Sequence, residues 1–288
     1  MRAFLKISVT SCLFLLSIPL LQAADTLKIH LTYKHKLNPS GQTTGYVTVN
    51  QKFYTPDNIY FREINYDEKT GQISDYTFYF YKNGRLFTGE CYDGQDSLKH
   101  ILKHEYDQNG NEILLTRLVL ASGKLVPAER TVSRFDAGNR IILLKKYTGK
   151  KLTRSSKYSY NESELMIRDV TKYKGSAAEK IKGETLDYSY NADGKISQVT
   201  INGRDASNKV FSKLEEYSYN EKNLLAGIKC FNGESVPAGE KIFKYLNSGA
   251  QSLYQENDAN GNIFLLLQYD YKKHYMERGT QVSSYENL

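Results

Sequence analysis

The residues of this chain that could do chemistry are few and scattered. Its five histidines stand at positions 30, 35, 100, 104 and 274. His100 and His104 are four residues apart, which would let two imidazoles share a metal ion on a helix, but no third ligand follows nearby. The motifs GxSxG, Walker A, GxGxxG and CxxC do not occur in the sequence. The sequence therefore predicts no catalytic residue, no metal site, no cofactor and a protein that is not an enzyme.

Paired tyrosines are the best candidates for a binding surface. The chain has 24 Tyr, 12 Phe and no Trp, and it contains the tripeptide Tyr-Ser-Tyr at 158–160, 188–190 and 217–219. Because side chains alternate along a strand, both rings of a pair lie on one face. Rigid rings with hydroxyl groups suit a glycan or a peptide. The predicted ligand-binding residues are Tyr158, Tyr160, Tyr188, Tyr190, Tyr217 and Tyr219. The alternative is that these rings pack in the core.

The tyrosine pairs belong to a repeated unit that must position them. Its central aromatic residues stand at 66, 106, 135, 160, 190 and 219, so the period is near 30 residues with insertions. In each unit an aromatic strand runs into Asp or Asn, then a polar turn, then an aliphatic strand. This order predicts a tight hairpin, with positive φ at Gly110, Gly194 and Gly261. The predicted fold is all-β, with antiparallel β-hairpin repeats forming an elongated curled sheet or a solenoid.

The units resemble the Tyr-Asp (YD) repeats of RHS and teneurin-type extracellular proteins. The resemblance rests on Tyr66-Asp67, on Tyr106-Asp107-Gln-Asn-Gly110 and on residues 188–196, and it extends over residues 60–270. Residues 79–89 also resemble a MORN-type repeat, which is built from similar hairpins. The YD resemblance implies an extracytoplasmic, non-enzymatic β-sheet spiral that serves as a shell, an adhesin or a glycan binder.

The first 23 residues are predicted to be a signal peptide. Arg2 and Lys6 precede an apolar run from Ile7 to Leu21, and small residues follow at 23 and 24. This pattern is typical of a secretory leader rather than of a membrane span. The other predicted divisions are an N-terminal β-hairpin at 24–60, the hairpin repeats at 61–275 and a C-terminal tail at 276–288. Later apolar runs are too short for a transmembrane helix. The sequence therefore predicts export through the inner membrane, to the periplasm or out of the cell.

The charge pattern and the repeats together suggest a function. The 288 residues carry 39 Lys and Arg against 32 Asp and Glu, and because this excess is not clustered it does not indicate a nucleic-acid surface. The sequence predicts a secreted or periplasmic repeat protein of the cell envelope. Its role would be a binding or scaffold module for a glycan, an envelope polymer or a protein partner.

Two other functions remain open. One is a periplasmic hydrolase on a two-layer β fold. The other is an outer-membrane β-barrel, against which the charges within candidate strands count, as in Lys213-Leu-Glu215-Glu216-Tyr217. A charged side chain that faces lipid costs about 2–4 kcal/mol at the middle of the bilayer.

Two cysteines, Cys91 and Cys230, remain after the predicted cleavage. In an open sheet the hairpins between them would separate the two residues by roughly 50 Å, whereas a disulfide needs Cα atoms within about 7 Å. An open array therefore predicts two unpaired, buried thiols, while a closed barrel or a folded-over sandwich would permit a bond.

Overall fold

Most of the described residues lie in strands, whose side chains alternate in burial and which are joined by short polar turns. The computed structural model describes residues 26–38, 42–233 and 235–275. The strands are β1 (Thr26–Leu37), β2 (Thr43–Tyr54), β3 (Tyr60–Tyr66), β4 (Ile73–Lys82), β5 (Arg85–Asp93), β6 (Leu98–Tyr106), β7 (Glu112–Ala121), β8 (Lys124–Phe135), β9 (Ile141–Thr148), β10 (Lys151–Tyr160), β11 (Met166–Tyr173), β12 (Ile181–Tyr190), β13 (Ile196–Asp205), β14 (Val210–Tyr219), β15 (Leu225–Asn232), β16 (Val236–Tyr245), β17 (Gln251–Asn257) and β18 (Ile263–Tyr275). A short 3₁₀ turn, η1 (Gly175–Ala178), joins β11 to β12.

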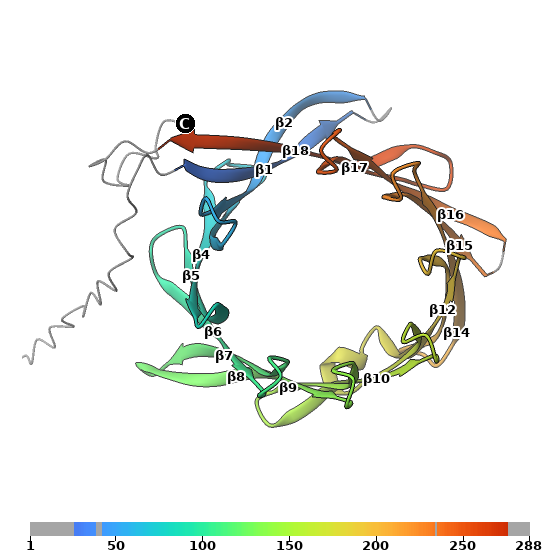
Figure 1. The fold of residues 1–288 in the computed structure, drawn as a ribbon, viewed down its shortest axis with the longest axis horizontal. Helices are drawn as coiled ribbons and strands as arrows, with labels where there is room; N and C mark the ends of the chain where they lie inside the picture. The colour runs from blue at the N-terminus through green and yellow to red at the C-terminus, as the bar shows by residue number, and fades with distance from the viewer. Residues whose placement is uncertain (1–25, 39–41, 234, 276–288) are drawn as a thin grey trace, which may run out of the picture.

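The sheet closes on itself into a barrel. Each strand pairs antiparallel with the next, and β18 also pairs with β1, where Thr32 lies opposite Tyr269. Figure 1 shows the resulting ring, viewed along its opening, with β1 and β18 side by side. The predicted all-β fold of antiparallel hairpins is confirmed, but the elongated sheet or solenoid is wrong. Closure removes the two unpaired edges that an open sheet of this length would expose.

The proposed repeat families are also corrected by this topology. In the barrel each hairpin pairs edge to edge with its neighbours in one continuous ladder. The units are therefore neither YD repeats of a spiral shell nor MORN-type repeats, although their turn chemistry is similar. Within the predicted N-terminal hairpin at 24–60, β1 and β2 do pair with each other. The predicted signal peptide at 1–23 and the tail at 276–288 lie outside the described residues.

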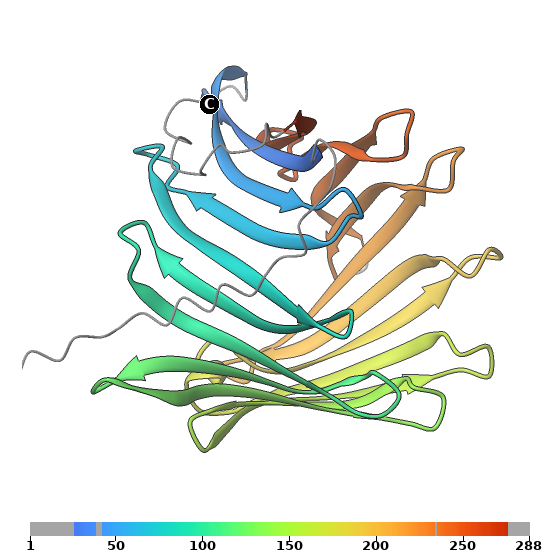
Figure 2. The same cartoon turned by 60° about the vertical axis from the view of Figure 1, so that its left-hand side comes forward.

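The turns divide into two rims. The terminal rim is the one where β1 begins and β18 ends, and it carries the turns that follow the even-numbered strands. The distal rim carries the turns that follow the odd-numbered strands. Connections at both rims are short, and Figure 2 shows the hairpins rising from a tilted, curved wall.

At the terminal rim, an Asp or Asn side chain caps the turns that follow β6, β8, β10, β12 and β14. In the turn after β12, the Asn191 side chain accepts hydrogen bonds from the backbone N–H groups of Asp193 and Lys195 at 3.1 and 2.9 Å. Three residues after these capping residues the backbone is left-handed, and the same holds after Asp258 in the distal turn that follows β17. Positive φ is therefore confirmed at Gly110, Gly194 and Gly261 (89°, 73° and 84°). Where glycine is missing the conformation persists, with φ of 63° at Glu164 and 62° at Asn223.

The wall is one sheet thick, so few side chains are deeply buried. The hydrophobic cluster of the described residues consists of Ile29, Leu31, Phe53 and Ile64, on β1 to β3. Beside it the Arg62 guanidinium lies 5.1 Å from the centre of the Phe78 ring. Elsewhere the fold depends on the backbone ladder and on the turns, because both faces of a wide barrel remain near solvent.

Candidate functional site: the lumen of the barrel

Burial identifies the face of the sheet that lines the lumen. On β11, Asp169 and Thr171 are 8% and 1% exposed, while Arg168 and Lys172 on the other face are exposed. Ser156, Val199 and Ile228, which are 0%, 1% and 7% exposed, lie on the same cross-strand face as Asp169 and Thr171. Because side chains on the concave face of a cylinder converge and screen one another, this face lines the lumen. On β1 to β3 the opposite face also holds a buried cluster, Ile29, Leu31, Phe53 and Ile64. Cross-strand pairing carries this assignment around the whole ring.

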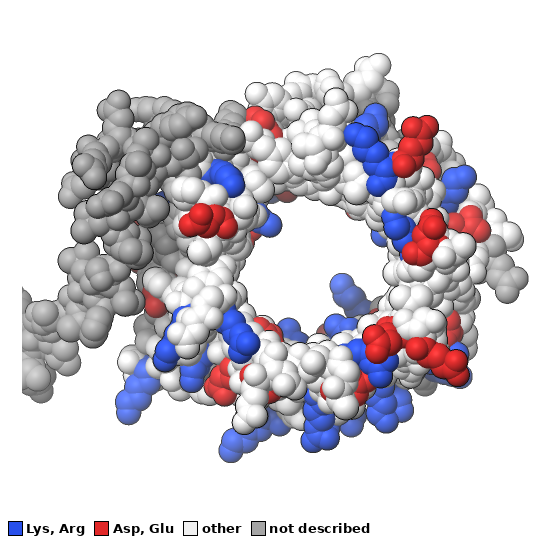
Figure 3. Space-filling model, in the orientation of Figure 1, with Lys and Arg blue, Asp and Glu red and all other residues white. Residues whose placement is uncertain are grey.

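The lumen is open and wide. For 18 strands about 4.8 Å apart and tilted by about 40°, the backbone diameter is on the order of 35 Å. Figure 3 shows an opening through the ring, and none of the described segments crosses it. The lumen is therefore the largest concave space that the described residues enclose.

Hydroxyl groups and carboxylates are built into the lumen wall. Ser156, which is fully buried at 0% exposure, lies 2.5 Å from the Thr171 hydroxyl, which in turn donates to Asp169 at 3.1 Å. Nothing in the sequence motifs indicated these residues. The sequence shows only that Ser156 and Thr171 stand among charged residues, in the segments 154–158 and 168–172.

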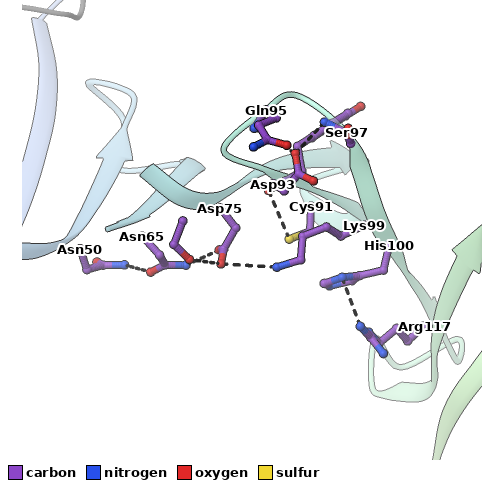
Figure 4. Close-up of polar contacts among 12 residues, drawn as sticks. Asn50, Asn65, Asp75, Cys91, Asp93, Gln95, Ser97, Lys99, His100 and Arg117 are labelled. Atoms are coloured by element: carbon purple, nitrogen blue, oxygen red, sulfur yellow. Dashed lines mark hydrogen bonds and ion pairs between the residues drawn. The ribbon is translucent and has the colours of Figure 1, made fainter. Parts of the chain in front are cut away.

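A second polar network crosses the wall from β2 to β4. The Asn50 amide donates to Asn65 at 2.7 Å, and the Asn65 amide donates to Asp75 at 2.8 Å. Lys99 lies 3.7 Å from the Asp75 carboxylate. Figure 4 shows these side chains in one row along the wall, with His100 and Arg117 further along it.

Opposite charges are paired across the lumen wall. Lys146 lies 3.2 Å from Glu129, and Lys241 lies 3.5 Å from Glu215. Glu215 also accepts a hydrogen bond from the Tyr217 hydroxyl at 2.7 Å. A wall with both signs interspersed offers polar contacts to a solute without selecting strongly for one charge.

Three of the six predicted tyrosine sites have a structural role. The hydroxyls of Tyr160, Tyr190 and Tyr219 donate to the carbonyls of Ile141, Met166 and Ile196 at 2.8, 2.5 and 2.8 Å. Each acceptor is the first residue of the preceding strand. Corresponding bonds join Tyr81 to Tyr60, Tyr106 to Leu86, Tyr245 to Leu225 and Tyr271 to Gln251.

The other three predicted tyrosines, Tyr158, Tyr188 and Tyr217, are half-buried in the lumen wall. They lie on β10, β12 and β14, and the strands between them place Asp169, Val199 and other residues opposite the rings. Alternate strands are about 10 Å apart, so the tyrosine pairs of neighbouring units do not stack on one another. Whether they bind a ligand stays a prediction.

The histidine pair does not form a helical metal clamp. His100 and His104 lie on β6, where four residues span about 13 Å. His104 instead approaches Glu112 at 2.5 Å, and His100 lies 3.5 Å from Arg117. Across residues 26–38, 42–233 and 235–275, no three His, Cys, Asp or Glu side chains are grouped so that they could hold a metal ion.

Cys91 and Cys230 are unpaired, as predicted, but only Cys91 is buried, whereas Cys230 is half-buried. The reason differs from the one expected, because the sheet is closed and not open. The two residues lie on β5 and β15, which are eight strands apart by the shorter way around the ring, and a disulfide needs Cα atoms within about 7 Å. Closure therefore does not bring the two thiols together.

Known proteins offer only distant likenesses. No family model and no curated protein matches the chain. A porin-like protein from Bacteroides uniformis ATCC 8492 shares 8% identity over 86% of this chain and 97% of its own, with a TM-score of 0.43. A porin-like protein from Bacteroides vulgatus ATCC 8482 shares 10% identity over 84% and 97%, with a TM-score of 0.37. A DUF1329 family protein from Desulfovibrio piger ATCC 29098 shares 8% identity over 92% and 91%, with a TM-score of 0.22.

The closed barrel overturns the predicted soluble binding or scaffold module of the periplasm or the cell exterior. That prediction needed an exposed, open array of hairpins, whereas here the predicted tyrosine faces line an enclosed lumen. Among the described residues, no helix has the length and apolar character needed to cross a membrane.

Proposed function

We propose that this chain is a non-enzymatic outer-membrane β-barrel that provides a water-filled passage for small polar solutes. The observation that carries the proposal is the closure of the sheet through β1 and β18 around an open lumen lined by hydroxyl groups and paired charges. A closed barrel leaves no unpaired backbone groups at a sheet edge, which is the condition for strands to cross a bilayer. The predicted leader at 1–23 would direct its export across the inner membrane.

Exposed apolar side chains gather at the two rims and support this placement. Eight lie near the distal rim and eight near the terminal rim, all within four residues of a strand end or in a turn. The distal group is Tyr46, Ile73, Leu120, Leu125, Val126, Val210, Val236 and Phe264, and the terminal group is Ile59, Phe80, Tyr81, Phe87, Ile113, Ile142, Ile167 and Leu246. A ten-residue strand tilted by about 40° rises by about 25 Å, the height of the apolar band of outer-membrane barrels.

Two of the three charges in the run that counted against a membrane barrel do not face outward. Lys213 and Glu215 lie on the lumen face, and only Glu216 of that run lies on the exterior. There Glu216 stands opposite Lys229, and Lys229 stands opposite Glu240 on the next strand. On β11 and β12, Arg168 pairs with Asp187 at 2.5 Å. Cross-strand pairing of this kind reduces the cost of exterior charge, which is about 2–4 kcal/mol for a lone Lys or Arg at the middle of the bilayer.

The native cysteine of β15 allows a direct test. Cys230 lies on the lumen face and its neighbour Lys229 lies on the exterior. In a C91S background, single channels in planar bilayers should lose conductance when a charged methanethiosulfonate reagent modifies Cys230. The matched control is C91S/K229C/C230S, in which the thiol is moved by one residue to the exterior, and its conductance should not respond. A folded protein that forms no channels, or equal responses from both variants, would refute a passage through the lumen.

A further inference from the structure

A hollow near the distal rim of β11 to β14 is lined mainly by residues of the exterior rows, although its lining also includes Thr171, Tyr173, Glu184 and Gly203 of the lumen rows. Its volume is about 490 Å³, and its lining includes Lys172, Lys174, Lys182 and Arg204. Lys172 and Arg204 stand on either side of Gly183 in one cross-strand row. Because glycine has no side chain, the row is open at its centre, between two cationic groups.

The turn between β13 and β14 holds two of these cations in place. The Lys182 ammonium donates to the Asn208 side chain at 3.0 Å, and the Arg204 guanidinium donates to the Asn208 carbonyl at 3.3 Å. Asn208 is itself fixed in the left-handed region, with φ of 68°. The one carboxylate in the lining, Glu184, accepts from the Tyr173 hydroxyl at 2.7 Å and lies in a lumen-facing row. The hollow therefore presents excess positive charge to the exterior.

The part of the distal rim around the hollow also carries net positive charge. The distal turns between β7 and β12, with the strand residues that flank them, carry Lys124, Lys150, Lys151, Lys174 and Lys180, against Glu179 as their acidic residue. Figure 3 shows Lys and Arg side chains projecting from this side of the ring, along its lower edge. A field of one sign attracts an anion to the wall before any specific contact forms.

Apolar side chains adjoin the cations. Val210 continues the row of Lys172, Gly183 and Arg204, and it is 61% exposed. Val170 lines the hollow in the row beneath. A ligand that contacts both the cations and the valines is amphipathic. Its anionic head would lie between Lys172 and Arg204, and its acyl chain would pack on the valines along the wall.

We propose that this hollow binds the phosphomonoester headgroup of a membrane lipid. A phosphate offers several acceptor oxygens to Lys and Arg, and contacts in which both partners are charged are about twice as strong as neutral hydrogen bonds. The inference rests on the proposed function, because the hollow lies on the wall that would face lipid. Free inorganic phosphate shares the head chemistry but has nothing to place against Val170 and Val210.

The test compares two variants with the same loss of charge. K172Q/R204Q removes the two cations that flank Gly183. The control R134Q/K157Q removes one Arg and one Lys that flank Leu143 in a similar exterior row near the terminal rim. Binding of short-chain phosphatidic acid, and of inorganic phosphate as a second ligand, is measured by calorimetry on the folded full-length protein in neutral detergent.

The expected result is that K172Q/R204Q weakens phosphatidic acid binding by at least about tenfold, that R134Q/K157Q binds like the wild type, and that inorganic phosphate binds far more weakly than the lipid. Equal affinity of both variants for the lipid would overturn the site. Equal affinity of the wild type for phosphate and lipid would overturn the lipid assignment. Channel conductance of the same preparations is recorded in parallel, so that failure of the passage is seen separately from failure of the headgroup site.

Discussion

The second tyrosine of each pair extends the hydrogen bonding between two strands beyond their last backbone pair. Between β11 and β12 the last paired residues at the terminal rim are Arg168 and Asp187. Three residues beyond Asp187, the Tyr190 hydroxyl donates to the carbonyl of Met166, two residues before Arg168. The same offsets hold at the other tyrosines that donate to a strand-starting carbonyl. The hydroxyl therefore replaces a backbone hydrogen bond where two strands separate.

We expect Tyr190→Phe to lower the free energy of unfolding by about 1 kcal/mol, the usual net value of one hydrogen bond. One hairpin lacks this tyrosine. Between β7 and β8 the last paired residues are Leu114 and Val132, and the residue three positions after Val132 is Phe135, which has no hydroxyl. Phe135→Tyr should therefore stabilise by a similar amount, through the carbonyl of Glu112. Urea unfolding in detergent micelles measures both. No change in either variant would mean that the hydroxyls are replaceable by water.

At the scale of the element, one Asp or Asn side chain holds each of several hairpin turns. Asp107 bonds the Asn111 side chain and its N–H at 2.9 Å, and Asp136 bonds the Arg140 side chain at 2.8 Å and its N–H at 2.9 Å. These bonds to the Asn111 and Arg140 side chains, together with those to the turn backbone, hold the pKa of both carboxyls below the usual range. At other turns Asn161, Asn191 and Asn220 occupy the same position without a charge.

The turns should therefore weaken in acid. A carboxyl with a lowered pKa in the folded state contributes stability above its unfolded value of about 3.9, and this contribution is lost as the pH falls through the folded pKa. The double variant D107N/D136N keeps the turn geometry of the Asn copies and should show a smaller loss of stability between about pH 6 and about pH 3 than the wild type. Thermal unfolding across that range measures it. A parallel loss in both proteins would place the acid sensitivity elsewhere.

At the scale of the whole molecule, one strand pair decides between a barrel and an open sheet. β1 is 12 residues long and β18 is 13, and nine residues of β1 are in register with β18. Without this pair the same hairpins would form a curled sheet with two free edges, which is a site of aggregation. The lumen, the proposed passage and the outward-facing hollow all depend on it.

Closure can be tested by a disulfide across β1 and β18. In a C91S/C230S background, Thr32→Cys with Tyr269→Cys joins two residues that lie opposite each other, at a Cα separation of about 4.5–5.5 Å that a disulfide accepts. The mismatched pair, Thr32→Cys with Tyr271→Cys, is offset by two residues on the same face and should oxidise poorly. Gel mobility before and after reduction measures both. Oxidation that does not distinguish the two pairs would argue against the observed register.

The sequence alone determined the local structure. Asp or Asn followed three residues later by Gly or Asn predicts a turn with positive φ whatever surrounds it, since the constraint lies in the backbone of five consecutive residues. Alternation along residues 27–34 likewise predicts a strand. The Tyr-x-Tyr pattern placed both rings of each pair on one face, but it did not show that Tyr190 reaches a carbonyl 24 residues earlier in the chain.

Only the tertiary structure decided that the sheet closes. The strand that closes the ring against β1 is β18, more than 200 residues away. No local property of either strand predicts this pairing. Whether a twisted sheet of hairpins stays open, winds as a solenoid or closes depends on the accumulated tilt and stagger of all its strands. The accumulated tilt and stagger also decide which face of the sheet becomes concave. As a result, the rows of Tyr, Ser and Asp that could have formed an outer binding surface line a lumen instead.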